Sequence, residues 1–306
     1  MKHLIVTLFI TILSTTLPAQ INMNDTTVQV IGYWDKNEKQ SYSVTHESYR
    51  VKGTDTSSRD LSKYKVNITI TDSTADSYTI DWFYHDYEIY SDNEVLQKIS
   101  TIVQDMTITF ITNELGVFQE VKNWKEVRDF IYKGLRMFKT ETKEIPNMDK
   151  YIRQMEKMYD SKESIEAAAI KEIRLFHSFH GGKYSFNNNI SATIKTANMY
   201  NSKEPFDTEL ILWVEEIDPE DNSSIICMEQ TVNSEQLTKT SFDYLTEIAA
   251  TLKTPAPVWS EFPALKNVTW TTSRIHGSGW VIYSIETKEV STEEDLYIQE
   301  CTIEIL

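Results

Sequence analysis

The chain has 306 residues, of which 46 are acidic and 30 are Lys or Arg, giving a formal net charge of −16. A protein this acidic repels nucleic acid and anionic membranes, so nucleic-acid binding is excluded as its main function. The length allows one large domain or two small ones, and either can bury a sizeable core.

The first 19 residues have the pattern of a secretory signal peptide. Lys2 precedes an apolar run at residues 4–13, and Leu17-Pro18-Ala19 offers a small-residue cleavage site. The run is too short to cross a hydrocarbon core of about 30 Å. We therefore expect cleavage after Ala19, export to the periplasm or the extracellular space, and no transmembrane segment in the mature chain.

Residues 28–121 have the pattern of antiparallel β structure. Between residues 64 and 71 apolar and polar side chains alternate, the period of a half-buried strand. A more aromatic strand follows at 78–90, a short helix is predicted at 93–104, and residues 106–121 indicate a hairpin. Two earlier strands are predicted at 28–34 and 40–53.

Residues 122–182 have helical spacing instead. Asn123 and Glu126 predict a capping box, and a first helix then carries five apolar side chains on one face. A second helix follows Pro146. A third is expected from a capping box at Asp160 and Glu163 to Gly181-Gly182, with its own apolar face. The two faces consist of Trp124, Val127, Ile131, Leu135 and Phe138, and of Ile165, Ala169, Ile173 and Phe176.

Residues 183–306 return to strand patterns, with a helix predicted at 234–252. The order of elements resembles that of the first β segment, which indicates either an internal duplication or the general likeness of amphipathic meanders. Strands are predicted at 183–196, 208–217, 224–232, 268–276, 280–290 and 296–306. No flexible linker separates the segments, so we predict a single α+β domain over residues 20–306. Its large antiparallel sheet or open β-barrel would pack against a central three-helix block.

Two cysteines, Cys227 and Cys301, fall in predicted strands. In an export compartment they could form a disulfide between neighbouring strands, or remain two small buried side chains. The sequence leaves both alternatives open.

No motif for a cofactor or a metal stands out, and neither is predicted. His177 and His180 have a spacing that could hold a metal, but two ligands do not make a site, and the histidines are better explained by contacts with carbonyl groups at a helix end. Asp81, His85, Asp86 and Glu88 could supply acid–base chemistry, with Asp81 and His85 on one face of a strand and the other two opposite. Gly277-Ser278-Gly279 is interpreted as a hairpin turn.

The chain is rich in aromatic residues, with seven Trp, twelve Phe and sixteen Tyr. On a curved sheet, inward-facing rings can line a pocket for an apolar ligand, or they can fill the core beneath helices. The candidates in predicted strands are Trp82, Tyr84, Phe110, Trp213, Trp270 and Trp280.

The hairpin at 113–121, the following Asn123-Trp124-Lys125-Glu126-Val127-Arg128, and Gly279-Trp280-Val281-Ile282 resemble stretches of uncharacterised secreted β-rich proteins of Gram-negative envelopes. The layout, a signal peptide and long strands wrapped around helices, is similar to that of LolA-type periplasmic lipoprotein carriers. This resemblance implies an open barrel whose concave face could hold acyl chains. The chain is longer than such carriers, and its helices cluster in one block.

The expected function is therefore binding of a hydrophobic or amphipathic ligand, such as a lipid or a lipidated partner, without enzymatic activity. The alternative is an interaction module that engages another envelope protein. A third hypothesis, a glycan or peptide hydrolase, requires two acidic side chains or a histidine with a nucleophile to converge in one cleft.

Overall fold

A computed structural model describes residues 20–53, 55–91, 105–141, 148–198 and 204–306. The predicted signal peptide and the predicted short helix at 93–104 lie outside these ranges. No helix in the described part of the chain is long and apolar enough to cross a membrane.

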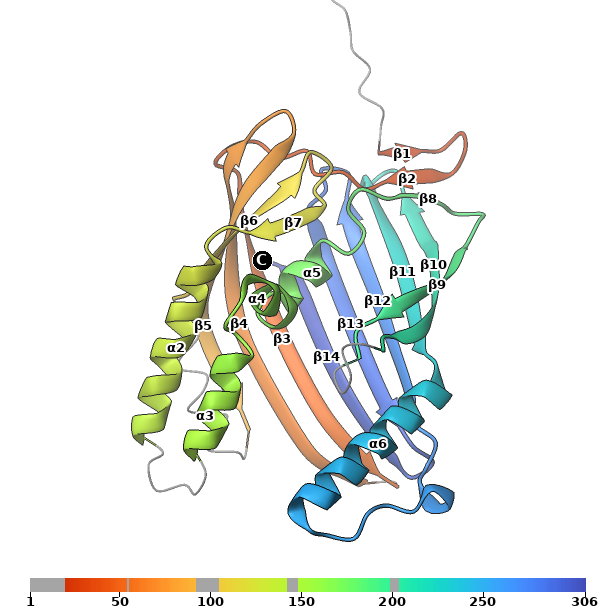
Figure 1. The fold of residues 1–306 in the computed structure, drawn as a ribbon. Helices are drawn as coiled ribbons and strands as arrows, with labels where there is room; N and C mark the ends of the chain where they lie inside the picture. Colours follow the sequence, from red (N-terminus) through yellow and green to blue (C-terminus); the bar gives the residue numbers. More distant parts are fainter. Residues whose placement is uncertain (1–19, 54, 92–104, 142–147, 199–203) are drawn as a thin grey trace, which may run out of the picture.

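Eleven of the described strands form one open antiparallel sheet, in which β3 and β14 join the two β segments (Figure 1). Because the sheet is continuous, the predicted α+β architecture with a large antiparallel sheet is confirmed; the internal duplication stays a prediction. In spatial order the strands are β7 (Phe118–Val121), β6 (Thr107–Asn113), β5 (Ser77–Tyr90), β4 (Asp55–Ser73), β3 (Lys39–Lys52), β14 (Asp295–Ile305), β13 (Val281–Ser291), β12 (Lys266–His276), β11 (Ser223–Val232), β10 (Phe206–Asp218) and β9 (Ile190–Thr196).

A second, three-stranded sheet lies near one end of the long strands. It consists of β1 (Ile21–Asn22), β2 (Thr27–Gln29) and β8 (Lys183–Ser185). The predicted strand at 28–34 is therefore much shorter than expected. The predicted strand at 183–196 is divided between the two sheets, because a turn separates β8 from β9.

The helices of the central block are α2 (Trp124–Glu141), α3 (Met148–Lys157), α4 (Lys162–Ala168) and α5 (Lys171–Phe176). The prediction of one long third helix was wrong. Ile170 is fully buried and has φ −129° and ψ 32°, outside the helical region, so the chain bends there into α5. Ser161 and Ser164 form the capping box of α4, in place of the predicted pair.

The predicted capping box of α2 is also not formed as expected. The side chain of Asn123 accepts a hydrogen bond from the Thr109 backbone N–H (2.8 Å) and donates one to the Thr107 carbonyl (3.0 Å). Asn123 therefore ties the start of α2 to β6 instead of capping the helix.

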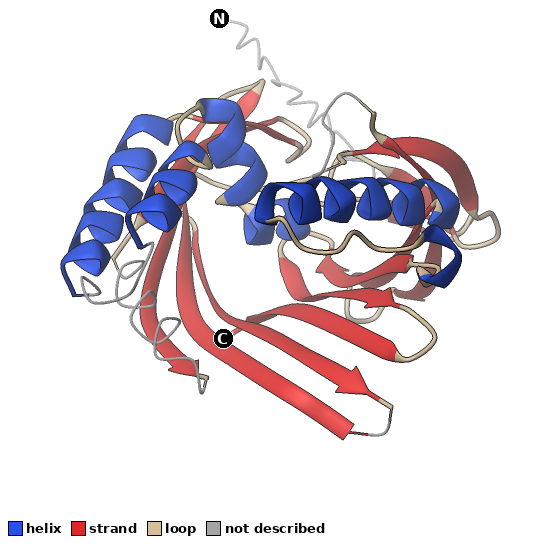
Figure 2. Ribbon diagram, turned by 60° about the horizontal axis from the view of Figure 1, so that its bottom comes forward, coloured by secondary structure: helices blue, strands red, loops and turns tan. Residues whose placement is uncertain are grey.

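The central helices and α6 (Ser234–Leu252) lie on the same, concave side of the sheet (Figure 2). Helix α2 lies near β6 at one edge, α5 over β13 and β14 in the middle, and α6 over β10 and β12 toward the other edge. Strand residues that are partners in register share a face, and Val44, Tyr64, Ile303 and Ile226 mark the buried one. A short 3-10 turn, η1 (Trp259–Glu261), follows α6.

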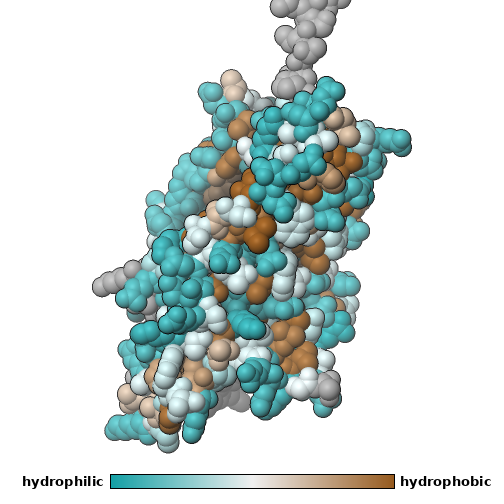
Figure 3. Space-filling view, turned by 90° about the vertical axis from the view of Figure 1, so that its right-hand side faces the viewer, coloured by the Kyte–Doolittle hydropathy of each residue, from teal (hydrophilic) through white to brown (hydrophobic). Residues whose placement is uncertain are grey.

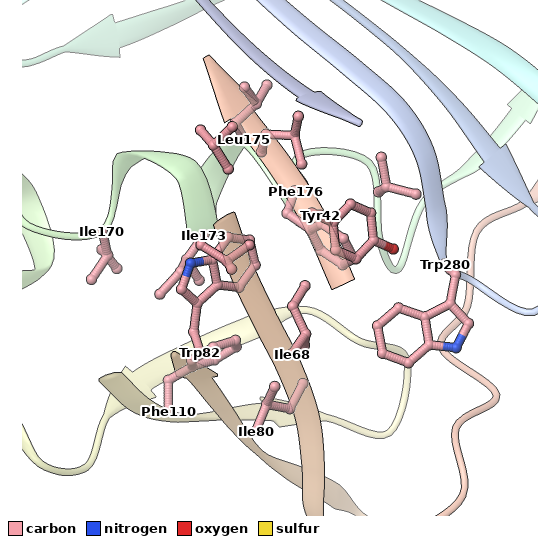
Figure 4. Packing of buried hydrophobic residues seen from close by; sticks show 14 of the residues in the cluster. Tyr42, Ile68, Ile80, Trp82, Phe110, Ile170, Ile173, Leu175, Phe176 and Trp280 are labelled. Atoms are coloured by element: carbon pink, nitrogen blue, oxygen red, sulfur yellow. The ribbon is translucent and has the colours of Figure 1, made fainter. Parts of the chain in front are cut away.

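Helix α5 fills the upper part of this inner face. The Phe176 ring lies 5.5 Å from that of Tyr42 and 5.6 Å from that of Trp82, both edge-on (Figure 4). Ile173 and Leu175 are buried beside it. The short α5 thus anchors the helical block to the middle of the sheet.

Candidate ligand-binding site

Four of the six candidate aromatic residues, Trp82, Tyr84, Phe110 and Trp280, are part of the core. Trp82 and Phe110 are fully buried and Trp280 is 4% exposed. The Trp280 ring lies 6.2 Å from Phe176, and its indole N–H donates to Glu38 (2.6 Å). These buried rings join the sheet to the helices.

Trp213 and Trp270 lie on the outer face of the sheet. Trp213 pairs in register with Cys227, and Trp270 with Glu229, both on the face opposite the buried one. The indole N–H groups donate to nearby carboxylates, Trp213 to Glu215 (2.8 Å) and Trp270 to Glu229 (3.2 Å). The six predicted residues therefore do not form one pocket.

Tyr84, the sixth candidate, does line a pocket. A cavity of about 180 Å³ lies between α2, α3 and α4 on one side and β5 on the other. It is small beside the roughly 300–1,000 Å³ of most ligand sites, so it suits a ring or one end of a chain. We call it the α2–α3 pocket; its lining is mostly apolar and consists of Tyr84, Tyr87, Met106, Phe130, Ile131, Leu135, Met155, Tyr159, Ala168, Ala169 and Glu172.

Glu172, in the first turn of α5, is the charged member of this lining, and its side chain is only 14% exposed. Its carboxylate lies 2.8 Å from Nε2 of His46, and the same nitrogen lies 2.9 Å from the Tyr64 hydroxyl. Burial alone would raise the pKa of Glu172. The hydrogen bonds from His46 and Tyr64 have the larger combined effect, so the pKa of Glu172 lies below its ordinary value. Glu172 therefore stands as a carboxylate at the edge of an apolar pocket.

A row of polar side chains crosses the inner face of the sheet beneath Glu172. His46, Cys301, Glu286 and Thr271 are partners in register on β3, β14, β13 and β12. We call these four residues the polar row.

The groups around the polar row have shifted pKa values. Burial raises the pKa of the Glu286 carboxyl, and burial together with the nearby charge of Lys171 lowers that of the Lys288 ammonium. Burial also raises the pKa of the Cys301 thiol well above its ordinary value. The Cys301 sulfur lies 3.9 Å from His46 Nε2, but a thiol held protonated is a poor nucleophile.

The two cysteines are unbonded. Cys301 faces inward beside His46, whereas Cys227 faces outward beside Thr272, and β12 and β13 separate their strands. With strands about 4.8 Å apart, their Cα atoms lie about 14 Å apart, too far for a disulfide. The disulfide alternative was therefore wrong.

His177 and His180 connect three distant parts of the chain. His177 Nδ1–H donates to the Gly116 carbonyl (2.8 Å) in the β6–β7 turn, and His180 Nε2–H donates to the Gly279 carbonyl (2.8 Å) in the β12–β13 turn. Both rings are buried. The predicted contacts with carbonyl groups at a helix end are not the ones formed, since both rings bond to carbonyl groups of hairpin turns. Among the described residues no cluster of three or more His, Cys, Asp or Glu could hold a metal.

The acidic group on β5 faces away from the concave side. Asp86 has φ 56° and forms a bulge, after which Tyr87 points inward, so Asp86 and Glu88 share the outer face with Asp81 and His85. The prediction that these residues lie on two faces was wrong. Asp86 pairs with Lys65 (3.1 Å), which gives the group a structural role.

Other hollows are more polar. One of them, about 620 Å³, lies beside α6 and is lined by charged side chains such as Lys195, Lys239 and Asp243, which take part in ion pairs. Another, about 280 Å³, lies beneath α6 and includes Gln230 and Lys288. The side of the molecule seen in Figure 3 is mainly hydrophilic with separate hydrophobic patches. The α2–α3 pocket is therefore the best candidate for an apolar ligand.

No family model matches the chain, and no curated protein matches its sequence. Solved structures that resemble it include one titled "Lipid-protein interactions in lipovitellin". The match has a TM-score of 0.40 and 7% identity, and covers 89% of this chain. The chain spans only about a quarter of the lipovitellin chain, 25%. Likeness at this level does not place the two proteins in one family.

The sequence contains a signal for the site residues His46 and Glu172. In β3 the inward positions run Tyr42, Val44, His46, so a polar residue stands in an otherwise apolar alternation. Glu172 likewise lies between Ala169 and Ile173 on a buried helical surface. A polar residue in an apolar pattern is the informative exception.

Proposed function

We propose that the protein is an exported binding protein of the cell envelope for a hydrophobic or amphipathic ligand, a lipid or a lipidated partner. The α2–α3 pocket carries this proposal, because its described lining residues combine apolar and aromatic side chains with one carboxylate. The open sheet with helices on its concave side also fits the layout expected of a LolA-type carrier. Cleavage after Ala19 and export are part of the proposal.

A saturable fluorescence titration with the neutral hydrophobic probe Nile red tests the binding. Ala168 lines the pocket at the end of α4, so Ala168→Phe adds a ring inside it and should abolish saturation. Ala167, the preceding residue, is exposed and does not line the pocket, so Ala167→Phe is a matched control that should bind normally. Non-saturable uptake, or equal binding by both variants, would exclude the pocket as the site.

A glycan or peptide hydrolase is the second candidate, because the polar row brings Glu286 and His46 close to Glu172. The pKa values of the two carboxyl groups are shifted in opposite directions, as in acid–base pairs. Turnover of chromogenic glycosides or peptides that is lost in Glu286→Gln would support this candidate. A stoichiometric envelope protein that co-purifies without a small molecule would instead support the interaction module.

A further inference from the structure

We infer that the α2–α3 pocket selects amphipathic amines, ligands whose apolar body ends in a cationic ammonium group, over alcohols and fatty acids of the same length. This inference rests on the proposed function and adds the chemical class of the ligand. It is carried by the position of Glu172, by the aromatic rings around the pocket and by the lack of a cation among its described lining residues.

The described lining residues include a negatively charged side chain and no positively charged one. Glu172 is the single carboxylate among them, and none of the lining residues in the described part of the chain is Lys, Arg or His. His46 lies 2.8 Å from Oε1 of this carboxylate, and Tyr64 also donates a hydrogen bond to it. Because a carboxylate offers about four lone-pair sites on two oxygens, it can accept further hydrogen bonds from a ligand N–H.

The aromatic rings of the lining suit the same group. Tyr84, Tyr87, Phe130 and Tyr159 all border the pocket. The negative faces of such rings attract an ammonium group, more strongly when water is excluded. Burial and the nearby Glu172 raise the pKa of Tyr84 well above its ordinary value, so its phenol stays neutral.

A fatty acid meets the opposite conditions. Its carboxylate would lie close to that of Glu172 in a site where burial has already removed water. None of the described lining residues is a Lys, Arg or His that could compensate the second negative charge. Like-charge placement of this kind rejects a ligand even where the apolar chain fits.

The test is competition for Nile red by decylammonium, decanol and decanoate at pH 7, each below its micelle concentration. The wild-type protein should bind decylammonium at least about tenfold more tightly than decanol, and decanoate more weakly than either. In Glu172→Gln the amine should lose this preference, while decanol binds as before and decanoate improves. Ala168→Phe should remove all three ligands together.

The matched control is Asp129→Asn, which removes an exposed carboxyl of α2 that does not line the pocket and should keep the amine preference. If Glu172→Gln fails to fold, the order of the three ligands on the wild-type protein still decides. Equal competition by all three, or an amine preference that survives Glu172→Gln, would overturn the inference and leave the binding function intact. Failure of Nile red itself to saturate would count against the function.

Discussion

Mild acid should destabilise the fold through His180. Its imidazole is buried and neutral, and its Nε2–H holds the Gly279 carbonyl in the β12–β13 turn. Burial lowers the pKa of His180 from 6.5 to about 4. In the unfolded chain the same ring regains its ordinary pKa, so between these pH values only the unfolded state binds a proton.

The sign and size of the effect follow from this difference. Above pH 6.5 the His180 ring is neutral in both the folded and the unfolded chain, so it does not lower the free energy of unfolding. Below pH 6.5 the ring takes up a proton in the unfolded chain, and the free energy of unfolding falls as the pH falls. The loss reaches about 1.4 kcal/mol per pH unit and totals about 3 kcal/mol near pH 4, where the native ring also titrates. His177 should add to it, because burial and the neighbouring His180 lower its pKa well below the ordinary value.

Urea unfolding followed by tryptophan fluorescence measures the effect at pH 7.5 and pH 5. In His180→Gln the side-chain amide can still donate to Gly279 but does not titrate, so the variant should lose about 2 kcal/mol less than the wild type over this range. Other ionisable groups are common to both proteins and cancel in the comparison. Parallel losses in the two proteins would refute the assignment of His180 as a buried neutral donor.

Three further measurements test the fold. Phe176→Ala should lower the free energy of unfolding by about 3–5 kcal/mol, because it removes the ring that packs between α5 and the sheet. Phe186 is 46% exposed, so Phe186→Ala should lower the free energy of unfolding only a little. Urea unfolding of both variants measures the difference. Gly279→Ala should lower the thermal unfolding temperature more than Gly53→Ala does. Both glycines have a positive φ, but a Cβ atom at Gly279 would lie 2.4 Å from the Ile31 backbone oxygen, whereas one at Gly53 would meet nothing within 4 Å. Thiol titration with Ellman's reagent should find two thiols per unfolded chain, with slow reaction in the native protein; fewer than two would show a disulfide that the structure lacks.

The sequence predicted the regular elements well because they depend on local spacing. The helix expected at 234–252 forms over Ser234–Leu252, and the period-two alternation at 64–71 lies within β4. Predictions failed where tertiary contacts outweigh local preference. Burial of Ile170 breaks the expected third helix, and Asn123 bonds to β6 instead of capping α2.

The candidate site could be predicted only in part. Aromatic content pointed to the concave face, but of six named residues only Tyr84 lines the pocket. The polar row depends on register between strands that are far apart in the sequence, such as His46 on β3 and Cys301 on β14. No local pattern fixes that register, so the meeting of His46, Glu172 and Glu286 needs the folded chain.

A crystal structure with a short alkylamine brominated on its chain tests the central claim most directly, because anomalous scattering locates the bromine atom. We expect a peak inside the α2–α3 pocket, among Tyr84, Phe130 and Tyr159, with the amine directed to Glu172. A peak beneath α6, or none in crystals soaked at a saturating concentration, would contradict it.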